Sequence, residues 1–238
     1  MSLVERKFSP SGVNGFYYCP KQWELHHKIT VTVPVDNIAL EFGAFVHNVI
    51  KEYFDLITNK PTGEQIEKVF RTVFDENFER NSFSHLKERA EKIRDNFIKF
   101  EKERLKEWSV YKPTLVETKL NNETYVTIVD FYSAPMETLI DWKTGNKNDI
   151  TDDDLRQGKI MELVLKSHEF KVSRILFVAL YPNRRFEIPH IGDGFVENEV
   201  RKMQDSIKTN YFPKSGRFCW NCDVVLDCQL EGCCLWLV

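Results

Sequence analysis

The sequence lacks any long apolar run, and no segment approaches the roughly 20 residues needed to span a bilayer. It also lacks a strong charge of either sign, because 33 Lys and Arg residues face 36 Asp and Glu residues. Its first residues contain no apolar stretch typical of a secretory signal, so we expect a cytoplasmic protein without a membrane partner. Affinity for phosphate depends on clustered Lys and Arg and not on net charge, so any basic surface that binds nucleic acid must be a local cluster.

Cysteine is nearly absent from the body of the chain and is concentrated near its end. Three cysteines form the pattern Cys219-x2-Cys222-x5-Cys228, and Cys19 lies about two hundred residues upstream. In a reducing compartment such a cluster indicates metal binding. Four thiolates suit zinc, although zinc ribbons usually pair their cysteines in two matched C-x-x-C motifs, and here the fourth is solitary. The two remaining cysteines, 233 and 234, have no assigned partner.

The first half of the chain predicts helices, because its apolar residues recur at three- and four-residue intervals. Pro20 suits a first helical turn and leaves Cys19 near the N-cap. The weak alternation at 29–36 predicts a short extended piece. The predicted helices cover residues 20–27, 39–57, 63–80, 84–108, 154–167 and 196–209.

After Pro113 the apolar period changes from about 3.6 to about 2, which is typical of strands. Three segments predict an antiparallel meander, and the apolar run 172–180 predicts a strand buried on both faces. The order of elements predicts an α/β protein with a mixed central sheet. We expect a single domain, residues 1–238, with a helical segment at 38–110 and a core at 111–210. The meander strands are predicted at 114–120, 123–132 and 138–143.

The strand at 138–143 carries a candidate for chemistry. Its side chains alternate, so Asp141 and Lys143 share one face and Trp142 takes the other. The ordinary interpretation is an exposed ion pair, because such pairs are common and weak. The alternative is a metal ligand beside a catalytic cation.

Two other residues favour the metal site. Alternation places Val126, Ile128 and Asp130 on one face of the preceding strand, with the carboxylate near its end. Converging carboxylates repel unless a cation lies between them, and Mg²⁺ and Mn²⁺ prefer oxygen ligands, with Mn²⁺ also accepting an imidazole. His47 lies at the border of an apolar helix face and offers that nitrogen, unless it is simply a half-buried structural histidine. We interpret Glu117 as a nearby carboxylate outside the ligand set.

These motifs resemble a known family. The Gly43-x-x-x-His47 pair, the strand-borne Asp130, the segment Ile140-Asp-Trp-Lys-Thr-Gly145 and the downstream Gln157 resemble the RecB-like branch of the PD-(D/E)xK nucleases. The resemblance implies a PD-(D/E)xK (restriction-endonuclease-like) core. Two positions depart from the branch: Thr127 replaces a usual glycine and Met161 a usual tyrosine.

The resemblance implies roles for five residues and one main-chain group. His47, Asp130 and Asp141 would hold Mg²⁺ or Mn²⁺, with the Trp142 carbonyl as a further ligand. Lys143 would orient or polarise the attacking water and stabilise charge on the phosphate. Gln157 would contact the site or the DNA.

The cysteines extend this resemblance to the iron–sulfur RecB-like nucleases, which include the CRISPR-associated adaptation exonucleases. It implies that Cys19, Cys219, Cys222 and Cys228 bind a [4Fe–4S] cluster. Such a cluster would act as a clasp that joins both chain ends, structural in role and coupled to folding.

The sequence therefore predicts a metal-dependent deoxyribonuclease, an exonuclease on single-stranded DNA or DNA ends. CRISPR adaptation, recombination repair and viral DNA processing all use this chemistry, and the resemblance implies a CRISPR integrase or another recombination protein as partner. The alternative is a catalytically weak DNA-binding or scaffold protein stapled by an iron–sulfur or zinc site. The sequence leaves the oligomeric state open. Candidate strand contacts are Tyr17, Tyr18, Lys21, Lys28, Lys147, Arg156, Lys159, Arg184 and Arg185.

Overall fold

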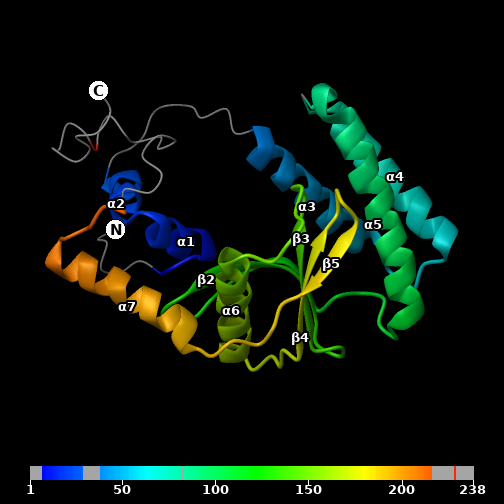
Figure 1. Cartoon of the computed structure of the whole chain (residues 1–238). Coiled ribbons are helices and arrows are strands. Elements are labelled where there is room, and N and C mark those ends of the chain that lie inside the picture. The colour runs from blue at the N-terminus through cyan, green and yellow to red at the C-terminus, as the bar shows by residue number, and fades with distance from the viewer. Residues whose placement is uncertain (1–6, 29–37, 82, 216–227, 229–238) are drawn as a thin grey trace.

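The computed structural model describes residues 7–28, 38–81, 83–215 and 228, arranged as helices around a five-stranded sheet (Figure 1). The extended piece predicted at 29–36 lies outside these residues, as do Cys219, Cys222 and the two last cysteines. None of the described helices is both long and apolar enough to span a membrane.

The sheet has the strand order β1-β2-β3-β4-β5, and the predicted mixed sheet is confirmed. β3 and β4 are parallel because α6 crosses over between them, whereas the other neighbours are antiparallel. β5 was not predicted, since it is short and begins with two exposed arginines. The strands span Leu115–Asn121, Val126–Ser133, Thr138–Lys143, Arg174–Ala179 and Arg184–Glu187.

Helices α3, α4 and α5 cover one face of the sheet (Figure 1). They lie close to the predicted ranges, with a short 3-10 turn at Ser84–Leu86 before α5. Trp142 of β3 is 2% exposed and packs edge-on against Phe97 and Phe100 of α5, at ring-centroid distances of 5.5 and 5.2 Å. Trp142 therefore points into this helical layer, as strand alternation predicts. The helices span Ile38–Leu56, Gly63–Glu79 and Lys87–Glu107.

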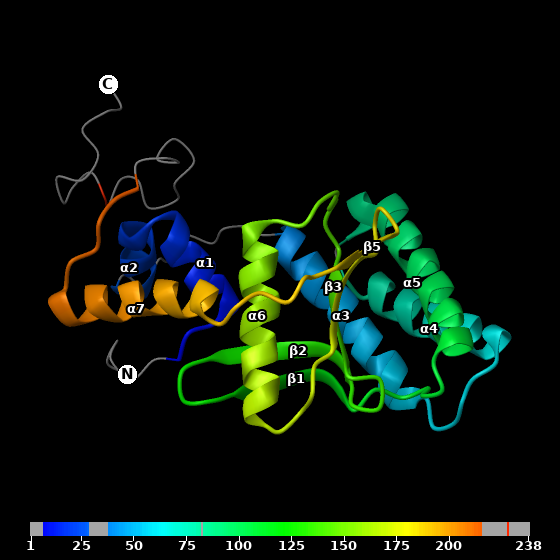
Figure 2. The same cartoon turned by 60° about the horizontal axis from the view of Figure 1, so that its bottom comes forward.

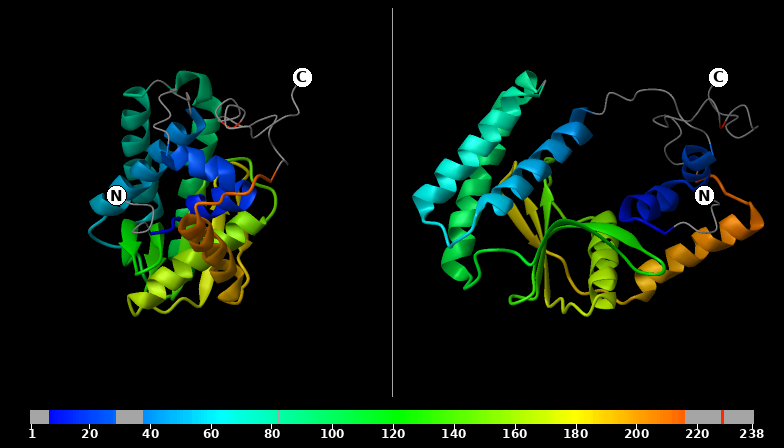
Figure 3. Two further views of the ribbon diagram at one scale, coloured as in Figure 1. Left: turned by 90° about the vertical axis from the view of Figure 1, so that its left-hand side faces the viewer. Right: turned by 180° about the vertical axis from the view of Figure 1, so that it is seen from behind.

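Helix α6 (Asp152–Ser167) packs on the opposite face, and α1, α2 and α7 lie beyond it (Figures 2 and 3). Arg156 of α6 is buried, donates from Nε to Asn14 Oδ1 at 2.7 Å, and lies 4.0 Å from the Tyr17 ring centroid. This guanidinium ties α1 to α6. The outer helices span Pro10–Tyr18, Pro20–Lys28 and Gly194–Thr209.

Strands β1 and β2 share an irregularity beside the site. Glu117 has φ 42°, a left-handed conformation that is uncommon for a non-glycine residue. Val129 and Tyr132 both pack in the cluster with α6, although strict alternation would place them on opposite faces. Strict alternation therefore breaks between Val129 and Tyr132, and exposure differs along the strand, with Ile128 52% exposed and Asp130 5% exposed.

Candidate metal centre

The site begins where β2 and β3 separate. The two strands pair from Phe131–Ile140 to Ser133–Thr138. Beyond that point a side chain of β2, and not its backbone, accepts a hydrogen bond from β3. Asp130 Oδ2 accepts a hydrogen bond from the Trp142 amide at 2.9 Å. Asp141 is also buried, at 2% exposure, so two buried carboxylates lie on adjacent strands next to the point where their pairing stops. Burying two such charges is costly unless a cation compensates them.

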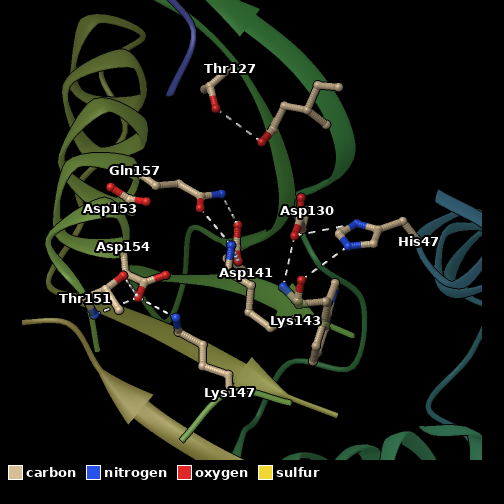
Figure 4. Close-up of polar contacts among 12 residues, drawn as sticks. His47, Thr127, Asp130, Asp141, Lys143, Lys147, Thr151, Asp153, Asp154 and Gln157 are labelled. Carbon is tan, nitrogen blue, oxygen red and sulfur yellow. Dashed lines mark hydrogen bonds and ion pairs between the residues drawn. The ribbon is translucent and has the colours of Figure 1, made fainter. Parts of the chain in front are cut away.

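Lys143 and Gln157 hold Asp141 from the α6 side of the sheet (Figure 4). The Lys143 ammonium lies 2.7 Å from Asp141 Oδ2 and donates to Gln157 Oε1 at 2.7 Å. Gln157 Nε2 donates in turn to Asp141 Oδ1 at 2.6 Å. A single amide therefore fixes both the carboxylate and the ammonium, as hydrogen bonds to the ligands do at metal sites.

The N-terminus of α6 is anchored so that Gln157 reaches β3. Thr151 and Asp154 form a capping box, and Lys147 pairs with Asp154 Oδ2 at 2.5 Å (Figure 4). Burial raises the pKa of Asp154, but the Lys147 ammonium and the hydrogen bonds from Thr151 together outweigh burial and lower that pKa. Asp154 therefore stays ionised and keeps the first turn in place.

His47 approaches from α3, on the other side of the sheet. Its Nδ1 lies 2.7 Å from Glu117 Oε1 and 3.6 Å from Asp130 Oδ2. Its Nε2 lies 3.2 Å from the Trp142 carbonyl oxygen. The left-handed backbone at Glu117 stands at the residue that orients this ring.

Charge at the site controls protonation. Burial opposes a charged His47, but the nearby carboxylates of Asp130 and Glu117 outweigh it and raise the histidine pKa to about 9. Burial and the charge of Asp141 raise the pKa of Asp130 well above its usual value. The metal-free site therefore binds protons tightly near neutral pH.

The residues fit a divalent ion. Donor atoms of His47, Glu117 and Asp130 all lie within 4.8 Å of one another. Asp141 Oδ2 is buried and makes no hydrogen bond within the described residues, although Lys143 is close. If His47 Nε2 loses its proton, its lone pair faces the Trp142 carbonyl, an arrangement that a cation stabilises. Carboxylate, carbonyl and imidazole donors suit Mg²⁺ or Mn²⁺.

The family of this chain is shown by comparison with known proteins. A family model described as the PD-(D/E)XK nuclease superfamily matches residues 7–174, which include every residue of the site. The chain belongs to this superfamily. A search of curated proteins finds no match. Nucleases of the PD-(D/E)XK superfamily use divalent metals such as Mg²⁺ or Mn²⁺ and act on DNA, so the α/β fold and the candidate acidic site agree with membership.

The structure brings together all five side chains predicted for the PD-(D/E)XK site. His47 comes from α3, Asp130 from β2, Asp141 and Lys143 from β3, and Gln157 from α6. Their individual roles stay predictions. Glu117, which the sequence interpretation left outside the ligand set, lies in the group of donor atoms. Its only sequence signal was a carboxylate on the strand paired with that of Asp130.

Two of the predicted DNA contacts are wrong. Arg156 and Lys159 are buried, and each pairs with a carboxylate, Arg156 with Asp153 and Lys159 with Glu162. These side chains hold α6 to its neighbours. Tyr17 and Tyr18 are partly exposed, as a stacking role requires.

Metal affinity is expected to rise with pH. His47 must lose its proton to bind a metal, and its pKa in the metal-free site is about 9. Each released proton makes apparent affinity rise about tenfold per pH unit below that pKa and level off above it. Titration calorimetry with Mn²⁺ in two buffers of different ionisation enthalpy measures both affinity and proton release. Affinity independent of pH between about 6 and 9, with no proton release, would contradict this assignment.

Proposed function

We propose that the protein is a metal-dependent deoxyribonuclease, an exonuclease that hydrolyses single-stranded DNA or DNA ends. The observation that supports this most is the convergence of five side chains from four elements where β2 separates from β3. Surface ion pairs do not require buried carboxylates, and here both aspartates are buried.

A bound Mg²⁺ or Mn²⁺ ion would lower the pKa of a coordinated water and offset charge on the phosphate. His47, Asp130, Asp141 and the Trp142 carbonyl are the groups that would hold it. Glu117 keeps the His47 ring oriented through Nδ1, which leaves Nε2 facing the site. The rigid imidazole and the buried carboxylates set the position of the ion before DNA arrives.

Lys143 acts on the reacting phosphate. Gln157 Oε1 accepts one of its N–H groups and Asp141 lies beside a second, so the third remains for the attacking water or a non-bridging phosphate oxygen. During hydrolysis the attacking water loses a proton as its oxygen forms a bond to phosphorus, the bond to the leaving oxygen breaks, and the leaving oxygen gains a proton from solvent. Lys143 stabilises the negative charge that develops on the phosphate.

We also propose that Cys19, Cys219, Cys222 and Cys228 bind a [4Fe–4S] cluster. Trp23, four residues after Cys19, stacks on Phe212, seven residues before Cys219, with ring centroids 6.0 Å apart. This contact places the start of α2 beside the segment that leads to the C-terminal cysteines, and Cys228 is buried. The biological setting that fits both parts is CRISPR adaptation or related DNA processing, with an integrase or another recombination protein as partner.

The nuclease proposal is tested in Mn²⁺ with two single-stranded DNA substrates, a linear strand labelled at one end and a circle labelled internally. We expect wild-type protein to degrade the linear strand and to leave the circle intact, and chelation to stop the reaction. Equal rates on circle and linear strand would rule out the exonuclease. No metal-dependent degradation of either would rule out the nuclease.

The cluster is tested by composition. Protein purified without oxygen is expected to be brown and to contain about four iron atoms and four sulfides per chain. Cys228→Ser should lose most of the iron. A colourless protein with one zinc ion and no iron would favour the zinc alternative and contradict the [4Fe–4S] cluster.

A further inference from the structure

A cavity of about 480 Å³ adjoins the metal centre and has no part in the chemistry described above. Asp130 and Gln157 line both the metal centre and this cavity. From them the cavity extends along β1 and β2 to the first turns of α1. Its volume lies in the range of pockets that hold one small molecule, roughly 300–1,000 Å³.

The β1–β2 side of the cavity combines a cation with uncovered aliphatic surface. Lys119 and Ile128 are direct cross-strand neighbours, and Val126 follows along the same face. Ile128 is half exposed, although it lies within a strand. Lys119 is exposed, and within the described residues no carboxylate pairs with it. An aliphatic surface beside a cation suits a molecule with an apolar body and an anionic group.

The opposite wall is preformed. Ser9 Oγ accepts from the Gly12 amide at 3.1 Å, which starts α1, and Asn14 is held by the buried Arg156. These contacts fix α1 against α6, so the cavity does not need to be built on binding.

Two residues that line the cavity differ from the RecB-like pattern, one on β2 and one on α6. They are Thr127 and Met161. Thr127 adds a side chain where the pattern has glycine, and its hydroxyl donates to the Ile128 carbonyl at 3.3 Å. Met161 offers a thioether in place of a phenol. Both residues are buried, Thr127 at 4% and Met161 at 2% exposure.

We propose that this cavity is the subsite for the unpaired nucleotide next to the cleaved phosphodiester, with its sugar and base on Ile128, Val126 and Met161 and its phosphate at Lys119. The inference rests on the proposed nuclease function and adds a reason for strand selection. The cavity has the volume of a site for one small molecule, so we expect an unpaired nucleotide to enter it more readily than a base pair. The phosphate of the nucleotide is the anionic group, and its base provides the apolar face.

The test measures binding of a short fluorescent oligodeoxythymidylate to full-length protein carrying Lys143→Ala, in Mn²⁺ and over a series of salt concentrations. Adding Lys119→Glu is expected to weaken binding about tenfold and to reduce the salt slope by about 0.7, the value for one phosphate contact on a single strand. Adding Ile128→Asp is expected to weaken binding by about the same factor. Both side chains are exposed, so neither change should unfold the protein.

The matched control is Lys68→Glu, which makes the same charge change on the exposed surface of α4. In the otherwise wild-type chain, Lys119→Glu should raise KM for single-stranded DNA with little change in kcat, and Lys68→Glu should change neither. If wild type cleaves DNA but all three variants bind alike, the subsite is overturned and the nuclease stands. If wild type neither binds nor cleaves, both proposals fall.

Discussion

Lys143→Ala is expected to slow metal-dependent cleavage of single-stranded DNA by about 10²- to 10⁴-fold at saturating DNA and metal. The ammonium contacts Asp141 and Gln157, and it is the charged donor that the strand presents beside the buried carboxylates. Its removal takes away the group that stabilises charge on the phosphate. The loss should therefore fall on kcat, because the charge develops during the reaction.

Metal binding separates this role from a structural one. Removing the ammonium relieves competition for Asp141, so Mn²⁺ affinity of Lys143→Ala should stay the same or increase. Lys143→Arg keeps the charge but not the compact geometry, so we expect it to recover little activity. Lys68→Ala on α4 serves as the control. Full activity of Lys143→Ala would contradict the catalytic assignment.

Asp130→Asn is expected to weaken Mn²⁺ binding by at least about 100-fold and to abolish cleavage at ordinary metal concentrations. The amide is neutral and resembles the protonated carboxyl, which burial and Asp141 already favour in the metal-free site. It can still accept from the Trp142 amide through its oxygen. The metal-free variant should therefore be about as stable as wild type, because the amide replaces a carboxyl whose neutral form the site already favours.

The histidine gives a second measurement for this variant. Asp130 provides the largest of the charge effects that raise the His47 pKa to about 9, so in Asp130→Asn that pKa should fall. An NMR titration of the histidine ring measures it, with Asp205→Asn on α7 as control. Unchanged metal affinity together with an unchanged His47 pKa would remove Asp130 from the site.

The helices and the meander could be predicted because long apolar stripes, and the change to a period of about two after Pro113, persist in the fold. The helix predicted at 39–57 became α3, and that at 63–80 became α4. Helix α1 escaped prediction, since it contains two glycines and depends on the Ser9 cap and on packing against α6 and α7. The prediction of one domain stays untested.

At the site, sequence order and strand alternation placed Asp141 and Lys143 on one face, and the structure agrees. The left-handed backbone of Glu117 could not be predicted, because a left-handed residue inside a strand cannot be seen in a periodicity. Strict alternation also breaks in β2, between Val129 and Tyr132. Burial of Arg156 was also hidden, since a charged residue on a helix usually faces solvent.

A scaffold protein without catalysis remains the rival interpretation, and the arrangement of the site argues against it. A chain that only binds DNA has no need for Gln157 to hold both Asp141 and Lys143 in position. It also has no need to bury two carboxylates beside a histidine, which costs stability in the metal-free state.

The most direct test of the central claim is the location of the metal. Crystals grown with Mn²⁺ and measured for anomalous scattering should show a strong peak about 2.1 Å from oxygens of Asp130 and Asp141 and from His47 Nε2, next to the Trp142 carbonyl. The peak should be absent in Asp130→Asn. A site without such a peak in the wild-type protein, at Mn²⁺ concentrations that support cleavage, would contradict the account.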